Sequence, residues 1–265
     1  HNIERSVQTN VSKLNLLKEM EKDYEGFNRS VKRILESCDK DKLLMDKVCG
    51  VVAQLIHVPK EYELAIEVAL GGSMQNVVTK TEEDAKYIID FLRKNKYGRA
   101  TFLPISSIRP RGLSNEEKNV LKMDGCIGIA SELIDYNRKY SNIFSYLLGI
   151  VVVVKNMDQG ISIAKRFRYS FRIVTIEGDT LNPGGSMTGG STGNRTTGIL
   201  GRQREIEELE KIVLQERSQL GKYVNNKKET LVLYNDCVMQ LDELRGRERN
   251  LEISKTSATE KDVAI

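Results

Sequence analysis

The sequence predicts a mixed α/β fold in which a centre of two subdomains is flanked by two helical arms that pair as an antiparallel coiled coil. Three observations predict this fold. Both ends of the 265-residue chain carry heptad patterns, the middle alternates strand-like and helix-like runs, and one segment of the middle recurs further along. The expected domains are an N-terminal arm at 1–46, a centre at 47–199, and a C-terminal arm and tail at 200–265.

The N-terminal arm is expected to be an amphipathic helix. A frame with alternating spacings of three and four begins at Leu14, and six of its eight positions are apolar or thiol. The frame runs through Leu14, Leu17, Glu21, Tyr24, Asn28, Val31, Leu35 and Cys38. This spacing is typical of a coiled-coil seam.

The C-terminal arm repeats the pattern over a longer stretch, with ten of fourteen positions apolar or thiol. The frame runs through Ile206, Leu209, Val213, Glu216, Leu220, Tyr223, Lys227, Thr230, Tyr234, Cys237, Leu241, Leu244, Glu248 and Leu251. Since the arms enclose one compact middle, the simplest closure is antiparallel pairing with each other. The alternative is two solvated helices that pack on the core, which usually show a broader apolar face.

The middle of the chain reads as strands and helices in mixed order. Thr81 is an expected helix N-cap, Ser114 and Glu117 form an expected capping box, and Gly71-Gly72 ends a helix where positive φ costs little. Strands are expected at 48–56, 75–79, 100–103, 150–154 and 172–176, and helices at 61–70, after Thr81, at 140–148 and at 161–167.

A weak internal repeat suggests two related subdomains. Residues 77–93 align with residues 152–168 at an offset of 75, and each segment reads as strand, turn and amphipathic helix. The subdomains would divide near residues 105–130. Chance similarity between two strand–helix units is the alternative.

The composition argues against several classes of protein. No run approaches the 18 or more apolar residues of a membrane span. Neither a disulfide framework nor a zinc site is expected, because the cysteines lack C-x-x-C spacing and only two histidines are present. These residues are Cys38, Cys49, Cys126, Cys237, His1 and His57.

The glycine-rich stretch at 177–198 raises the question of catalysis. It contains no phosphate-binding G-x-x-x-x-G-K-[ST] loop. Residues 189–193 match the G-x-S-x-G nucleophile elbow, but no histidine follows His57 in the chain. The glycine pairs at 184–185 and 189–190 instead permit positive φ and close approach of another backbone. A nucleotide-binding or hydrolytic enzyme that uses this loop is the competing interpretation.

Three blocks, in order between the arms, together resemble the hinge of bacterial SMC (structural maintenance of chromosomes) proteins. They are Tyr62–Gly72, Gly98–Pro104 and Thr175–Gly190. The resemblance implies an SMC-hinge-like fold whose task is homodimerisation rather than catalysis. The interface residues that it implies are Gly71, Gly72, Gly184, Gly185, Ser186, Met187, Thr188, Gly189 and Gly190.

The same resemblance implies the context of a longer protein. The arms would lead to ATPase heads that bind ATP and Mg²⁺ and meet other condensin subunits, so no cofactor is expected in this stretch. The protein would be cytoplasmic, associated with the nucleoid, and active in chromosome condensation and segregation.

Weak DNA binding without sequence preference is a further expectation. The net charge of +4 is concentrated in residues 47–199, where 20 basic and 15 acidic residues leave +5. The candidate contacts at the junction with the arms are Lys47, Arg195, Arg202 and Arg204. The alternative is an ordinary solvated helix start, because four glutamates follow between residues 205 and 210. A general nucleic-acid-binding module is the third reading that the charge permits.

Overall fold

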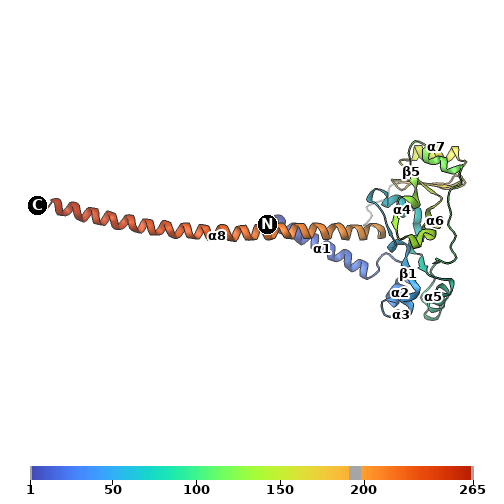
Figure 1. Cartoon of the computed structure of the whole chain (residues 1–265), viewed down its shortest axis with the longest axis horizontal. Helices are drawn as coiled ribbons and strands as arrows, with labels where there is room; N and C mark the ends of the chain where they lie inside the picture. Colours follow the sequence, from blue (N-terminus) through green and yellow to red (C-terminus); the bar gives the residue numbers. More distant parts are fainter. Residues whose placement is uncertain (1, 191–197, 264–265) are drawn as a thin grey trace. The chain divides into compact units, whose positions relative to one another are not determined.

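The computed structural model describes residues 2–190 and 198–263, with side chains up to Lys255. The chain divides into two compact units. One is Asn15–Glu208, and the other combines the described residues of His1–Leu14 and Leu209–Ile265. The larger unit contains both sheets of the predicted centre (Figure 1).

The first sheet has three strands in the order β1-β3-β4. These strands are β1 (Val48–Val51), β3 (Val77–Thr79) and β4 (Phe102–Pro104), and α5 (Glu82–Asn95) joins the parallel pair β3 and β4. Helices α2 (Arg29–Cys38) and α3 (Lys42–Lys47) complete this subdomain. Its core contains Ile34 of α2, Leu44 of α3 and Ile88 of α5.

The second sheet has five strands in the order β10-β9-β8-β7-β5. Helix α7 (Met157–Arg166) joins the parallel pair β7 and β8, and β9 and β10 form an antiparallel hairpin. The strands are β5 (Cys126–Ile129), β7 (Val151–Val154), β8 (Arg172–Thr175), β9 (Thr180–Leu181) and β10 (Met187–Thr188).

A third hydrophobic core connects the two sheets. Helices α4 (Glu63–Leu70) and α6 (Ser141–Leu148) contribute most of it, together with residues from strands of both sheets such as Val78 and Val153. The short strands β2 (Ile56–His57) and β6 (Asp135–Tyr136) pair across this region. The two subdomains therefore share one interior.

The two sheets confirm the internal repeat. In each, a first strand with a register shift lies antiparallel to the second, and a helix then leads to a third, parallel strand. Val77 and Val152, which the offset of 75 aligns, begin the paired part of the second strands. Thr81 and Asn156, also 75 residues apart, both accept a backbone hydrogen bond as N-caps.

The N-terminal frame does not form one helix, and this expectation is corrected. Helix α1 (Asn2–Lys22) ends at Lys22, and a turn with positive φ at Tyr24 (51°) and Gly26 (90°) precedes α2. Val31 and Leu35 then pack into the first subdomain's core. The predicted domain boundaries at 46/47 and 199/200 stay predictions.

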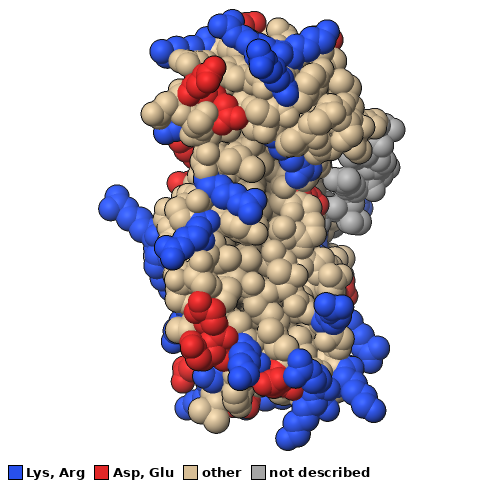
Figure 2. All heavy atoms as spheres, turned by 90° about the vertical axis from the view of Figure 1, so that its right-hand side faces the viewer, with Lys and Arg blue, Asp and Glu red and all other residues tan. Residues whose placement is uncertain are grey.

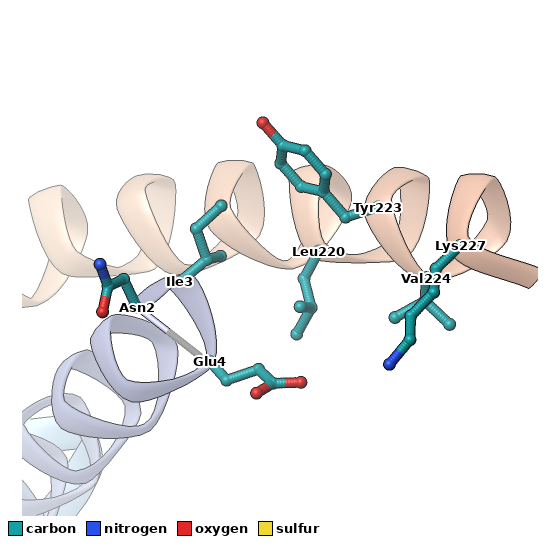
Figure 3. Close-up of a pocket in the computed structure, with 7 residues that line it drawn as sticks. All are labelled: Asn2, Ile3, Glu4, Leu220, Tyr223, Val224 and Lys227. Carbon is teal, nitrogen blue, oxygen red and sulfur yellow. The ribbon is translucent and has the colours of Figure 1, made fainter. Parts of the chain in front are cut away.

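Helix α8 (Ile199–Val263) extends through the predicted C-terminal arm. In the smaller unit, Ser6 and Asn10 of α1 donate hydrogen bonds to Glu216, whereas the earlier residues 2–4 lie beside residues 220–227 (Figure 3). This order shows that the two helices run antiparallel there, as predicted. From Gly221 to Lys255, the α8 side chains that the structure describes are exposed.

Candidate dimerisation interface

The glycine pair at 184–185 forms the tip of the β9–β10 hairpin. Asn182 and Ser186 close the turn, because the Asn182 amide donates to the Ser186 carbonyl at 2.8 Å. Gly184 and Gly185 have φ values of 84° and 97°, a region that side chains with a Cβ rarely adopt. No described atom lies within 4 Å of an added Cβ at either glycine. The tip is attached through its backbone, since the Gly184 amide donates to the Tyr169 carbonyl at 3.4 Å, but the side on which a Cβ would lie is open among the described residues.

The second glycine pair is tied back to the sheet by Asp179. The Gly190 amide donates to Asp179 Oδ1 at 3.2 Å, and the Asp179 amide donates to Thr175 Oγ1 at 3.0 Å. A Cβ at Gly189 would collide with the same carboxylate. Thr175 is fully buried at the end of β8. The block thus combines an exposed surface with a fixed backbone.

The strand β10 is a free edge. It ends the five-stranded sheet, and no further strand pairs with it in the described part of the chain. Met187 on this strand is 50% exposed. An edge of this kind presents backbone groups that a strand of another molecule can pair with. β4 is likewise an edge of the first sheet.

The turn at Gly71-Gly72 lies at the end of α4 and is the third element of the predicted interface. Gly71 has a φ of 49° and ends the helix, and a Cβ on either glycine would meet open space. Arg172, on β8, donates to the carbonyls of Ala69 and Val68 just before the turn. Arg172 and Asp179 were not identified as important residues from the sequence. Arg172 could have been noticed, because it is a charged residue at the start of an otherwise apolar strand.

The three predicted DNA contacts that lie among the described residues do not form a free cationic cluster. Arg202 is only 7% exposed, and its guanidinium donates to the carbonyls of Met20 and Glu25. Arg204 pairs with Glu63 and Glu208, and the hydrogen bond that it donates to Glu63 raises the pKa of Arg204. Lys47 is engaged by Asp84 at 2.8 Å, and Arg195 lies outside the described residues. The geometry of the first three does not favour phosphate contacts.

Lysine and arginine side chains gather elsewhere on the larger unit. Figure 2 shows them at both ends of one face and also at mid-height along one side, beside an uncharged area. One end carries α5, and the segment that follows runs from there toward α6, where Arg111 lies over the Tyr146 ring. Residues 91–115 contain six basic and no acidic residues. They are Arg93, Lys94, Lys96, Arg99, Arg109 and Arg111.

Neither a metal centre nor a membrane segment is evident among the described residues. They contain no group of three or more histidine, cysteine, aspartate or glutamate side chains placed to hold a metal ion. Among the same residues, no helix is both apolar and long enough to cross a membrane. The residues that match the G-x-S-x-G pattern continue into 191–193, which lie outside the described part.

Comparison with known proteins explains this arrangement. The family described as "SMC proteins Flexible Hinge Domain" matches residues 45–164. A crystal structure described as an asymmetric dimer of the Geobacillus stearothermophilus SMC hinge domain is 38% identical, with a TM-score of 0.73. The match covers 84% of this chain and 88% of that one. The chain belongs to the SMC hinge family.

Curated relatives place the hinge within much longer proteins. The Chromosome partition protein Smc of Clostridium kluyveri is 42% identical over 227 residues, and that of Bacillus subtilis is 40% identical over 206. The matches cover 85% and 77% of this chain but only 18% and 17% of those proteins. The Pyrococcus furiosus SMC hinge is more distant, at 29% identity and a TM-score of 0.51, with 73% of this chain and 93% of that one covered.

Proposed function

We propose that this hinge forms a homodimer through the 184–190 block, the Gly71-Gly72 turn and an edge strand of the partner's first sheet. The observation that carries the proposal is the free edge of β10 beside a glycine tip where an added Cβ would meet no described atom of its own chain within 4 Å. The related Geobacillus stearothermophilus hinge is described as a dimer. Strand pairing between β10 and the partner's β4 would satisfy both free edges at once.

In the longer protein, the dimer would join two arms. We propose that these arms lead to ATPase heads where ATP, Mg²⁺ and other condensin subunits bind, and that the protein works on the chromosome in the cytoplasm. The names and lengths of the curated relatives support this proposal. The hinge itself would be the binding element, not the catalytic one.

The geometry of the loop favours binding over the competing nucleotide-binding or hydrolytic interpretation. A phosphate cradle needs backbone N–H groups that converge on an anion, usually at a helix N-terminus. The 184–185 pair lies in a tight β-hairpin instead, and the Gly185 amide already donates to the Asn182 carbonyl at 2.9 Å. Titration with ATP and a panel of ester substrates tests the alternative, since turnover at enzyme-like rates would support it.

The dimer is tested by introducing charge at its centre. Gly184→Glu with Gly185→Glu should convert the dimer to a monomer, because carboxylates at a close backbone contact clash and repel, and positive φ is strained for glutamate. Met187→Glu should weaken the dimer without any strain in φ, because Met187 is exposed on β10. Light scattering over a range of micromolar concentrations measures the mass.

The matched control introduces the same two charges elsewhere. Gly221→Glu with Gly246→Glu changes two glycines of α8 whose surroundings are open. This variant should dimerise like the wild type. If the 184–185 and Met187 variants keep wild-type affinity, the proposed interface is wrong.

We also propose weak DNA binding by the hinge as a second function. The support is the basic surface of residues 91–115, together with Arg195 as predicted from the sequence. Lys47, Arg202 and Arg204 are less suited to phosphate contacts because each already has a protein partner. Contacts to phosphates alone would carry little sequence preference.

A further inference from the structure

Helix α4 leads directly into the Gly71-Gly72 turn, and an arginine from another element holds each of its ends. At the first turn, Glu63 accepts hydrogen bonds from Arg204 Nε and from Arg204 Nη2, the latter at 3.1 Å. At the last turn, Arg172 Nη1 donates to the Ala69 carbonyl at 2.9 Å and Nη2 donates to the Val68 carbonyl at 3.2 Å. Arg204 belongs to the start of α8, whereas Arg172 begins β8.

The pair at the first turn is shielded from solvent. The side chains of Arg204 and Glu63 are 16% and 18% exposed. Their two-point contact fixes both position and angle, which a single contact cannot do. Loss of Glu63 would leave Arg204 with Glu208 as its remaining ion-pair partner, and loss of Arg204 would remove the ion pair that Glu63 makes. Either loss should cost more than breaking an exposed pair, because both side chains are shielded from solvent. The first turn of α4 is therefore firmly attached to α8.

The contact at the last turn forms although it requires partial burial of the Arg172 guanidinium. The final carbonyls of a helix lack partners within the helix and attract cations. Burial lowers the pKa of Arg172, and its Nε is buried with no hydrogen-bond partner in the described part of the chain. Because the guanidinium spans two carbonyls, it determines where α4 ends and in which direction Gly71 leaves it.

Between its ends, α4 is packed as a rigid body. Ala65, Ile66, Ala69 and Leu70 lie in the core shared by the two subdomains. Leu64 contacts the β8–β9 turn so closely that a Cβ on Gly178 would come within 3.1 Å of its Cγ. Close-packed interiors transmit displacements instead of absorbing them. With eight residues, the helix is about 12 Å long.

We infer that α4 couples the start of the C-terminal arm to the dimer interface, with Arg204 and Arg172 as its positioning residues. The inference rests on the proposed dimerisation. A movement of the first turns of α8 shifts Glu63, and the rigid helix carries this shift to the Gly71-Gly72 turn. Coupling between two sites is reciprocal, so dimerisation in turn favours the Arg204–Glu63 contact.

The test uses the full chain and variants that remove each contact. Arg204→Gln, Glu63→Gln and their combination should each weaken the dimer about 5- to 20-fold, within the usual range of coupling between sites. The combination should be no weaker than the single variants, because all three remove the same contact. Arg172→Lys keeps the charge but cannot span two carbonyls, and it should weaken the dimer similarly.

Sedimentation velocity gives the dissociation constant, and hydrogen exchange follows residues 68–75. Faster exchange there in Arg204→Gln, whose altered residue lies at the far end of α4, is the expected sign of coupling. Asp90→Asn with Arg93→Gln removes an exposed ion pair of α5 and should change neither measurement. If the glutamine variants do not fold, Arg204→Lys provides the same comparison with the charge retained.

The outcomes separate the inference from the proposed function. A wild-type dimer whose affinity is unchanged in every folded variant overturns the inference alone, even if the variants melt at lower temperature. A wild-type chain that stays monomeric at tens of micromolar overturns the proposed dimerisation and the inference with it.

Discussion

At the scale of the residue, partners decide what each charge does. Lys47, Arg202 and Arg204 read as free cations in the sequence, yet the fold supplies each with a carboxylate or a carbonyl. Glycines behave differently, because the lack of a Cβ lets them adopt positive φ without a partner elsewhere in the fold. Gly71, Gly184 and Gly185 all adopt the positive φ that their positions in the sequence suggested.

The Lys47–Asp84 pair carries a testable pH dependence. Lys47 Nζ lies 2.8 Å from Asp84 Oδ1, and this hydrogen bond lowers the pKa of Asp84 and raises that of Lys47. The pKa of Asp84 is lower in the folded protein than in the unfolded chain, where it is about 3.9. The ionised carboxylate therefore stabilises the fold above the unfolded pKa, and this stabilisation is lost as pH falls through the folded pKa. The raised pKa of Lys47 means that its stabilising contribution persists to high pH. This contribution is lost only as pH rises through the pKa of Lys47 in the folded protein.

Lys47→Met should therefore cost stability at neutral pH and progressively less as the medium becomes acidic below about pH 4. Urea unfolding between about pH 2 and pH 7 measures the difference in free energy of unfolding from the wild type. Lys86→Met, which changes an exposed lysine of α5, the helix that carries Asp84, is the control. A difference for Lys47→Met that stays constant down to pH 2 would contradict this assignment.

At the scale of the element, spacing alone does not distinguish a coiled-coil seam from a helix that packs on a core. Residues 14–38 keep one spacing of three and four, but α1 ends at Lys22 and α2 belongs to the first subdomain. The capping pairs were better guides. Ser114 and Glu117 exchange the predicted hydrogen bonds, although they open a short 3₁₀ turn at Glu117–Lys122 and not an α-helix.

The register of α1 against α8 predicts which cysteine pairs can be crosslinked. Asn10 Nδ2 lies 2.9 Å from Glu216 Oε2, so Asn10→Cys with Glu216→Cys should crosslink within one chain when the four native cysteines are replaced by serine. Cys38 and Cys237 should not crosslink, as the predicted pairing of the arms also requires. A short bismaleimide and a gel-shift assay measure both reactions. Efficient joining of Cys38 to Cys237 within one chain would refute the register.

At the scale of the whole molecule, sheet edges and basic surfaces are available for partners. β4 and β10 are among the edge strands of the two larger sheets, and Figure 2 shows basic side chains at both ends of one face. The unpaired edge strands suit binding of a second copy of the hinge, and the basic side chains suit binding of a polyanion. Because β4 lies within residues 91–115, the two proposed functions would use neighbouring residues of the chain.

DNA binding should depend steeply on salt if phosphate contacts drive it. The log–log slope of affinity against salt should be about −0.9 per phosphate contact on duplexes and about −0.7 on single strands. Fluorescence anisotropy at about 50 and about 200 mM salt measures it, for the wild type, for Arg195→Glu and for Lys94→Glu with Lys96→Glu. Asp158→Asn, which changes an acidic residue of α7, serves as the control. Binding that neither charge reversal weakens would show that another surface is used, and no binding at low salt would refute the proposal.

The sequence by itself determined the features that depend on local chemistry. The alternation of strands and helices, the N-cap at Thr81 and the glycines with positive φ follow from backbone preferences within a few residues. The offset of 75 revealed the repeated subdomain, because the same strand–helix unit needs the same pattern twice. The three blocks between the arms were enough to indicate the hinge family.

The tertiary structure alone decided the features that depend on residues far apart in the chain. The order of the strands leaves β4 and β10 as edges, and no local pattern specifies which strands have a neighbour. Arg202 is buried because the carbonyls of Met20 and Glu25 come to it from another helix and its turn. Arg172 reaches α4 across 103 residues of sequence. Hydrogen bonding and desolvation depend on what folding brings within about 3 Å, and sequence spacing does not record that distance.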